Sequence, residues 1–121
     1  MKLIDMHCDT LLGTAYGEEI DLFQNEKAVD FQRMKQAGYS AQFFAMCLMP
    51  EAHFQKKGLK KPDDMSFMKA LSDCFYRNLK QHGEIAAFAE NKQDLLENER
   101  QGKLSCFLSV EDGNGINGSL S

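Results

Sequence analysis

The chain has 121 residues, enough for one domain with a sizeable hydrophobic core. It is 43% hydrophobic and 26% charged, like an ordinary globular protein, and its formal net charge of −4 argues against a general nucleic-acid binder. No apolar run approaches the roughly 20 residues of a membrane span, and the N-terminus lacks the pattern of a signal peptide. We therefore expect neither a nucleic-acid partner nor a membrane partner.

The four cysteines form no C-x-x-C pair, and most lie in apolar segments, where a free thiol behaves as a small hydrophobic side chain (Cys8, Cys47, Cys74 and Cys106). This usage favours reduced thiols and a cytoplasmic protein. The one basic run, residues 56–61, has no interleaved aromatic residue and is interpreted as a solvated loop.

The chain begins with a short buried strand at residues 3–6, which runs directly into His7-Cys8-Asp9. The segment that follows, to about Glu26, has no clear period. We expect a loop there, with a helical turn or a short strand around residues 20–23.

A short helix is predicted at residues 31–36, with Asp30 as its cap and Gly38 as its stop. Residues 39–49 are almost continuously apolar, as in a strand covered on both faces of a parallel sheet. The polar residues 50–62, with a proline at each end, predict a loop.

The clearest helix opens at Asp63 or Asp64 and ends at residues 82–83. Its apolar side chains recur at helical spacing and form one stripe: Phe67, Leu71, Cys74, Phe75 and Leu79. Residues 85–89 then predict a strand, residues 91–101 a helix capped by Asn91, and residues 104–110 a strand. The alternation of strands and helices predicts an α/β fold with a mainly parallel sheet.

Three candidate metal ligands stand at strand ends. His7 and Asp9 follow the first strand, and Glu111 follows the last. In parallel α/β proteins ligands gather at the carboxyl ends of strands, and imidazole with carboxylates suits zinc or a similar divalent ion. The alternative is structural: His7 hydrogen-bonded to Asp9, with Glu111 capping a following turn. His53 and His82 are expected at the surface rather than in a metal site.

A glycine-rich motif, G-x-G-x-x-G, occupies residues 113–118 after the last predicted strand. Such a motif binds dinucleotides when its glycines open a helix, which would make the chain a nucleotide-binding α/β domain. Glu111 and Asp112 would place negative charge beside the phosphates. A flexible glycine-rich loop is the alternative.

Three segments, in order, resemble the membrane (renal-type) dipeptidases, peptidase family M19 of the amidohydrolase superfamily. Residues 4–11, with His7 and Asp9, resemble the opening metal motif of that family. Residues 38–44 resemble its second-strand segment, and residues 109–113 its strand-end Glu-Gly segment. Together the matches cover essentially the whole chain.

The resemblance implies a (β/α)8 TIM barrel with two zinc ions, in which a metal-bound hydroxide hydrolyses dipeptides. It implies that His7 and Asp9 hold one zinc ion and that Glu111 bridges both, so that Asp9 and Glu111 are the catalytic residues in this chain. Asp112 and Asn114 stand where many members have glycine and histidine. The remaining ligands of the family come from later strands.

We therefore expect residues 1–121 to form a single partial domain, the N-terminal portion of a zinc-dependent dipeptidase, with a dipeptide as its substrate. Alone, this chain is expected to show little or no dipeptidase activity. Its expected partners are copies of itself in a homo-oligomer, or a missing C-terminal half. A noncatalytic fragment or interaction module on the same scaffold is the other interpretation.

Overall fold

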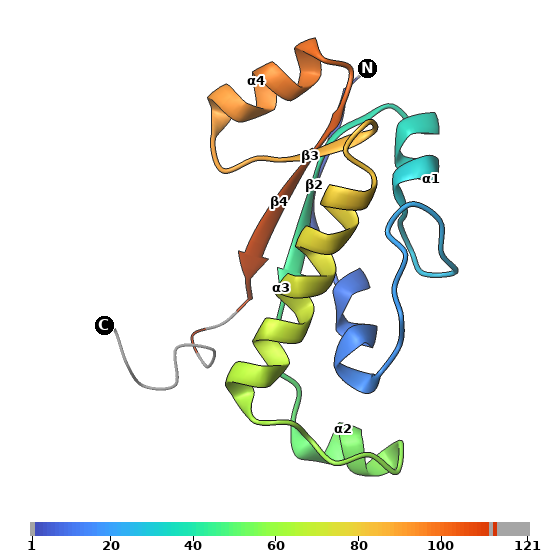
Figure 1. Ribbon diagram of the computed structural model, residues 1–121, viewed down its shortest axis with the longest axis vertical. Coiled ribbons are helices and arrows are strands. Elements are labelled where there is room, and N and C mark those ends of the chain that lie inside the picture. Colours follow the sequence, from blue (N-terminus) through green and yellow to red (C-terminus); the bar gives the residue numbers. More distant parts are fainter. Residues whose placement is uncertain (1, 112, 114–121) are drawn as a thin grey trace.

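A computed structural model describes residues 2–111 and Gly113. Its centre is a sheet of four strands in the order β1-β2-β4-β3, and all three neighbouring pairs are parallel (Figure 1). The strands are β1 (Leu3–Cys8), β2 (Tyr39–Met46), β3 (Ala86–Phe88) and β4 (Leu104–Val110). The predicted α/β fold with a parallel sheet is confirmed.

Five helical segments connect the strands: the 3-10 helix η1 (Thr10–Tyr16) and the α-helices α1 (Phe31–Gln36), α2 (Glu51–Lys56), α3 (Asp64–Gln81) and α4 (Lys92–Arg100). Helices α1 and α3 lie on one side of the sheet, and α4 lies at the opposite side near the N-terminus (Figure 1). In the part of the chain described, no helix is long and apolar enough to cross a membrane.

Helix α3 forms because one stripe of its surface is apolar and is buried against the sheet. All five residues of the predicted stripe are buried. Among them, Phe75 packs against Phe44 of β2 with ring centroids 5.7 Å apart, and Phe44 also meets Phe31 of α1 at 6.3 Å. These aromatic contacts join α1, α3 and the central strand in one core.

Two expectations for the connecting segments are wrong. Residues 50–62 are not all loop, because α2 forms there and buries Phe54 completely against Tyr16 and Phe67. Residues 20–23 form neither a helical turn nor a strand, and the helical segment of this region lies earlier, at η1. The β2 strand also ends at Met46, earlier than the apolar run suggests.

The cap of α1 is confirmed and is part of a larger buried network. The Asp30 side chain is almost fully buried, and it accepts hydrogen bonds from the amides of Arg33 and Asn25 and from the Arg33 Nε atom. Burial acts to raise the pKa of Asp30, but these hydrogen bonds and the Arg33 charge outweigh it, so the pKa lies below its usual range.

Replacing Asp30 by asparagine is expected to destabilise the fold in a pH-dependent way. Because the pKa is lower in the folded state, the charged carboxylate contributes stability above its unfolded pKa of about 3.9, and this is lost as the pH falls through the folded value. We expect a loss of about 1–2 kcal/mol at neutral pH, the order of an N-cap contribution, shrinking in acid. Urea unfolding across this pH range measures it.

The exposed Asp73 of α3, replaced by asparagine in the same way, serves as the control. A difference between wild type and Asp30→Asn that stays constant from neutral to acidic pH would contradict the role of the Asp30 charge.

Candidate metal centre

The three predicted ligands come from β1 and β4, which lie on either side of β2. Strand β1 ends at Cys8, and Asp9 follows in a non-extended conformation as the residue before η1. The Glu111 amide donates to the Met46 carbonyl at 3.0 Å, which continues the pairing of β2 and β4 one residue past the strand. The sheet therefore brings the ends of β1 and β4 together over the end of β2.

The three side chains converge. His7 Nε2 lies 3.1 Å from Asp9 Oδ1 and 3.9 Å from Glu111 Oε2, and one ligand atom from each residue lies within 4.8 Å of the others. The side chains are 50%, 54% and 50% exposed, so the site is open to solvent on one side. Residues more than 100 positions apart in sequence thus form one cluster.

The donor set and its spacing fit a zinc ion. Two ligands about 2.1 Å from a tetrahedral zinc ion lie about 3.4 Å from each other, and the two measured separations from His7 lie on either side of that value. One imidazole and two carboxylates are also ordinary zinc ligands, and three protein ligands leave a position for water or substrate.

The structural alternative predicted the same contact between His7 and Asp9. Nε2 of His7 and Oδ1 of Asp9 are at hydrogen-bond distance, and the His7 amide donates to Asp5 Oδ1 at 3.3 Å. The first bond orients the imidazole without a metal, and the second fixes the backbone of His7. Glu111 adds a second carboxylate beside the His7 ring, which a hydrogen-bonded strand end does not require.

A pocket of about 420 Å³ adjoins the cluster, and its lining includes His7, Asp9, Lys27, Ala28 and Val29. Sequence reasoning missed the contribution of residues 27–29, since they lie in an irregular segment without a motif. Lys27 ion-pairs with Glu18 at 2.6 Å. Cys8 also lines the pocket, and burial raises the pKa of its thiol, which makes it a poor nucleophile.

The other two histidines lie away from this centre. His53 is exposed on α2, as expected. His82 is not a surface residue: its side chain is 19% exposed, and its ring stacks on Phe23 at 5.2 Å. The reason is that the ring at the end of α3 lies against Phe23 and Phe31, with its Nε2 atom 3.2 Å from Asp21 Oδ1.

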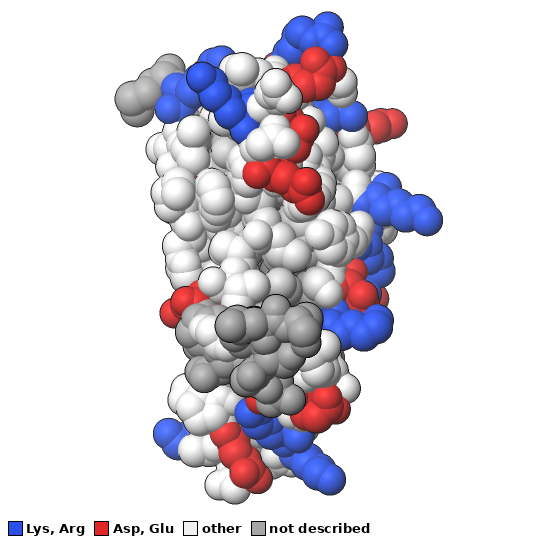
Figure 2. All heavy atoms as spheres, turned by 90° about the vertical axis from the view of Figure 1, so that its left-hand side faces the viewer, with Lys and Arg blue, Asp and Glu red and all other residues white. Residues whose placement is uncertain are grey.

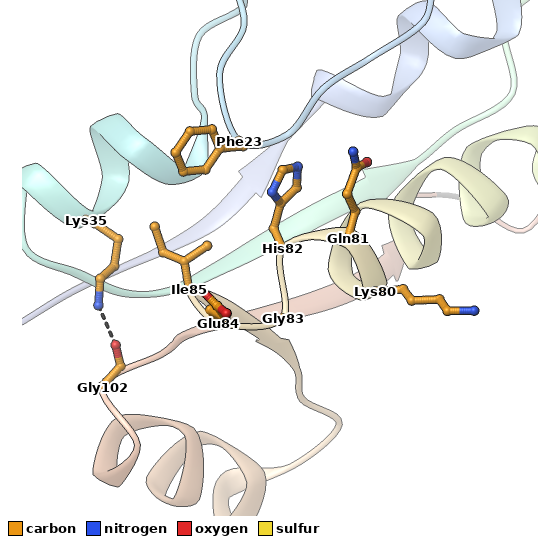
Figure 3. Close-up of a pocket in the computed structure, with 9 residues that line it drawn as sticks. All are labelled: Phe23, Lys35, Lys80, Gln81, His82, Gly83, Glu84, Ile85 and Gly102. Carbon is orange, nitrogen blue, oxygen red and sulfur yellow. Dashed lines mark hydrogen bonds between the residues drawn. The ribbon is translucent and has the colours of Figure 1, made fainter.

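His82 borders a second pocket, of about 660 Å³, at the end of the sheet where the strands begin (Figure 3). There Lys35 donates to the Gly102 carbonyl at 2.6 Å, while Lys80 points away from the other labelled side chains (Figure 3). The cationic groups do not converge, so this pocket offers no built anion site.

The glycine-rich motif at residues 113–118 lies outside the described residues except for Gly113. Asp112 and Asn114, the two departures from the family pattern, also lie outside them.

A parallel α/β sheet with imidazole and carboxylate groups at its carboxyl end is the arrangement of a partial (β/α)8 metallohydrolase barrel. Comparison with known families agrees: the pattern of the membrane dipeptidases, peptidase family M19, matches residues 1–121. The chain belongs to this family. The predicted family is therefore confirmed.

Among solved structures, the chain is similar to the crystal structure of dipeptidase AC, described as a metallopeptidase of family M19. The TM-score is 0.71 at 18% identity, over 93% of this chain and 37% of that chain. The likeness confirms the fold as part of a barrel, and the chain spans little more than a third of that dipeptidase. A search of curated proteins finds no significant match.

Proposed function

We propose that this chain supplies one zinc site of a zinc-dependent dipeptidase. The main support for this proposal is the convergence of His7, Asp9 and Glu111 at the carboxyl end of a parallel sheet, where one ligand atom of each residue lies within 4.8 Å of the others. Membership of family M19 supports a metallopeptidase, and the hydrolysis of dipeptides, the identity of the ion as zinc and the binuclear site are parts of the proposal.

Each of the three residues has a role in this proposal. His7 donates a ring nitrogen to the ion, and the hydrogen bond from its amide to Asp5 keeps the strand end in place. Asp9 and Glu111 would bring two negative charges that hold the ion, and Glu111 would also serve a second ion. Bound zinc supplies a Lewis acid that polarises the substrate carbonyl and acidifies water.

The pocket beside the candidate metal centre is the proposed substrate-binding site. His7 and Asp9 line it together with Lys27, Ala28 and Val29, and its volume of about 420 Å³ is enough for part of a dipeptide. The reaction adds one water across the peptide bond and releases two amino acids. We also propose that residues 1–121 form a single partial domain. The proposed location is cytoplasmic, and this rests on the pattern of thiols.

Zinc titration tests the proposed site. We expect the purified chain to bind one zinc ion by calorimetry, and expect His7→Ala and Glu111→Ala each to weaken binding by more than about 100-fold, since the loss of a ligand exceeds the 10–100-fold effect of a supporting contact. Each variant removes one of the three donors that converge here.

The matched control is His53→Ala, which removes an exposed histidine from α2. Unchanged zinc stoichiometry and affinity in His7→Ala and Glu111→Ala would refute the site. Little or no turnover of a dipeptide panel is expected from the chain alone, whereas turnover equal to that of an intact dipeptidase would contradict the assignment of a partial centre.

A noncatalytic role on the same scaffold is the second candidate. It is favoured by the exposure of about half of each ligand side chain, which leaves the centre open. This candidate predicts a folded chain that takes up no zinc, so the same titration separates the two.

A further inference from the structure

The pairing of β1 with β2 is irregular beside the candidate metal centre. Asp5 pairs with Gln42 and Cys8 pairs with Phe44, so three steps along β1 match two steps along β2. One extra residue in a strand is a β-bulge, which sets two residues opposite one on the partner strand. The extra residue of β1 lies within residues 6–7, directly at the first predicted ligand.

The bulge changes the side of the sheet to which His7 points. Paired residues lie on the same side of a sheet, and so do alternate residues of one strand. In an unbroken pairing His7 would lie opposite Phe44, which is fully buried in the core beneath α1 and α3. Because of the extra residue, Cys8 takes that place and is buried in the same core. His7 therefore points to the other side, like its neighbour Met6, which is 65% exposed.

Glu111 points to that other side as well. Phe43 pairs with Phe107, and their rings stack at 4.4 Å. Glu111 follows Phe107 by four residues and its amide continues the pairing, so its side chain lies on the side of these rings. Seen from the side away from α1, the molecule has a broad area with few charged side chains, which lie mostly around its margin (Figure 2). The 3.9 Å contact between His7 and Glu111 thus depends on the bulge.

The side chain of Asp5 supports this bulge. The extra residue of a bulge stands outside the regular ladder of backbone hydrogen bonds, and a bond within the same strand can hold it there. The His7 amide donates such a bond to Asp5 Oδ1 at 3.3 Å, from two residues further along the chain. Asp5 thereby fixes the backbone at the point where the regular pairing is interrupted.

We propose that Asp5 is a positioning residue, whose side chain holds the β-bulge and so keeps the His7 ring on the side of Glu111. The inference rests on the proposed zinc site, which gives the orientation of His7 its purpose, although the bulge itself needs no ion. Asp5 acts here through the backbone of His7 and is not one of the three converging ligand residues. Its oxygen as an acceptor matters in this role, and its charge does not.

Two substitutions separate the hydrogen bond from the charge. Asp5→Ala removes the acceptor, whereas Asp5→Asn keeps an Oδ1 acceptor and removes the charge. In zinc calorimetry of the whole chain we expect Asp5→Ala to bind roughly 10–100-fold more weakly than the wild type, the effect of a supporting contact, and Asp5→Asn to stay within about threefold of it. Asp21→Ala is the matched control, because Asp21 Oδ1 accepts the Phe23 amide at 2.8 Å across the same two-residue spacing. It should leave zinc affinity unchanged.

Hydrogen exchange of the metal-free chain, kept in a chelator, tests the bulge without the ion. The His7 amide is expected to lose protection in Asp5→Ala and to keep it in Asp5→Asn. Circular dichroism checks that each variant keeps the fold of the wild type.

An Asp5→Ala chain with the zinc affinity or the His7 exchange of the wild type would overturn the proposal. So would a loss of affinity in Asp5→Asn or in Asp21→Ala as large as that in Asp5→Ala. If the wild type took up no zinc, the proposed function would fail, and the exchange of the His7 amide would still decide whether Asp5 holds the bulge.

Discussion

Replacing Phe75 by alanine is expected to remove a large part of the stability of the fold. The side chain is fully buried under α3, and its ring meets Phe44 of β2 at 5.7 Å and Phe88 of β3 at 6.0 Å. Truncation leaves a cavity at the point where α3 joins two strands. Such Phe→Ala changes cost about 3–5 kcal/mol, against a total of about 5–15 kcal/mol for a typical domain.

The neighbouring residue provides the control. Tyr76 is also aromatic and on α3, but it is 48% exposed, so Tyr76→Ala is expected to cost about 1 kcal/mol. Urea unfolding under identical conditions compares the two variants. Equal losses would show that α3 is not anchored through Phe75.

The long elements were predictable because their periodicity reflects burial on one side. The stripe on α3 and the apolar runs of β2 and β4 each specify their own structure, and Asp30, Asp63 and Asn91 all accept the expected capping bonds. In these segments local propensity and tertiary packing favour the same conformation.

The short segments could not be predicted because distant residues determine them. Helix α2 is held by Phe54, which inserts between Tyr16 and Phe67 from two other elements. The order of the strands is similarly non-local: β3 comes third in the chain but lies at the outer edge, beyond β4. No pattern within residues 85–89 indicates this position.

The sequence predicted which residues form the candidate site but not how their side chains are arranged in space. His-x-Asp after one strand and Glu after another indicated the ligands, and the parallel sheet explains why they meet. His7 and Asp9 are not alternate residues of one extended strand, because β1 ends at Cys8. The backbone instead turns at Asp9, and that turn brings the carboxylate to the imidazole.

Asn78 shows most clearly what sequence patterns leave out. It is a buried residue of α3, although the apolar pattern of the helix does not include it. Its side chain accepts a hydrogen bond from the Leu22 amide at 2.8 Å and donates to the Ile20 carbonyl at 3.0 Å. These bonds replace the partners that a strand would have provided, which is why residues 20–23 are ordered without regular structure.

Asn78→Ala is therefore expected to destabilise the protein by about 2–4 kcal/mol, because the buried amide of Leu22 and the carbonyl of Ile20 lose their partners. Hydrogen exchange should show the effect locally, with the Leu22 amide losing protection relative to the amides of β2 and β4. Arg77→Ala, one position earlier and exposed, is the matched control and should leave both measurements nearly unchanged. If Leu22 kept its protection in Asn78→Ala, the loop would be held by the packing of Ile20 and Leu22 alone, and the hydrogen bonds of Asn78 would not determine its path.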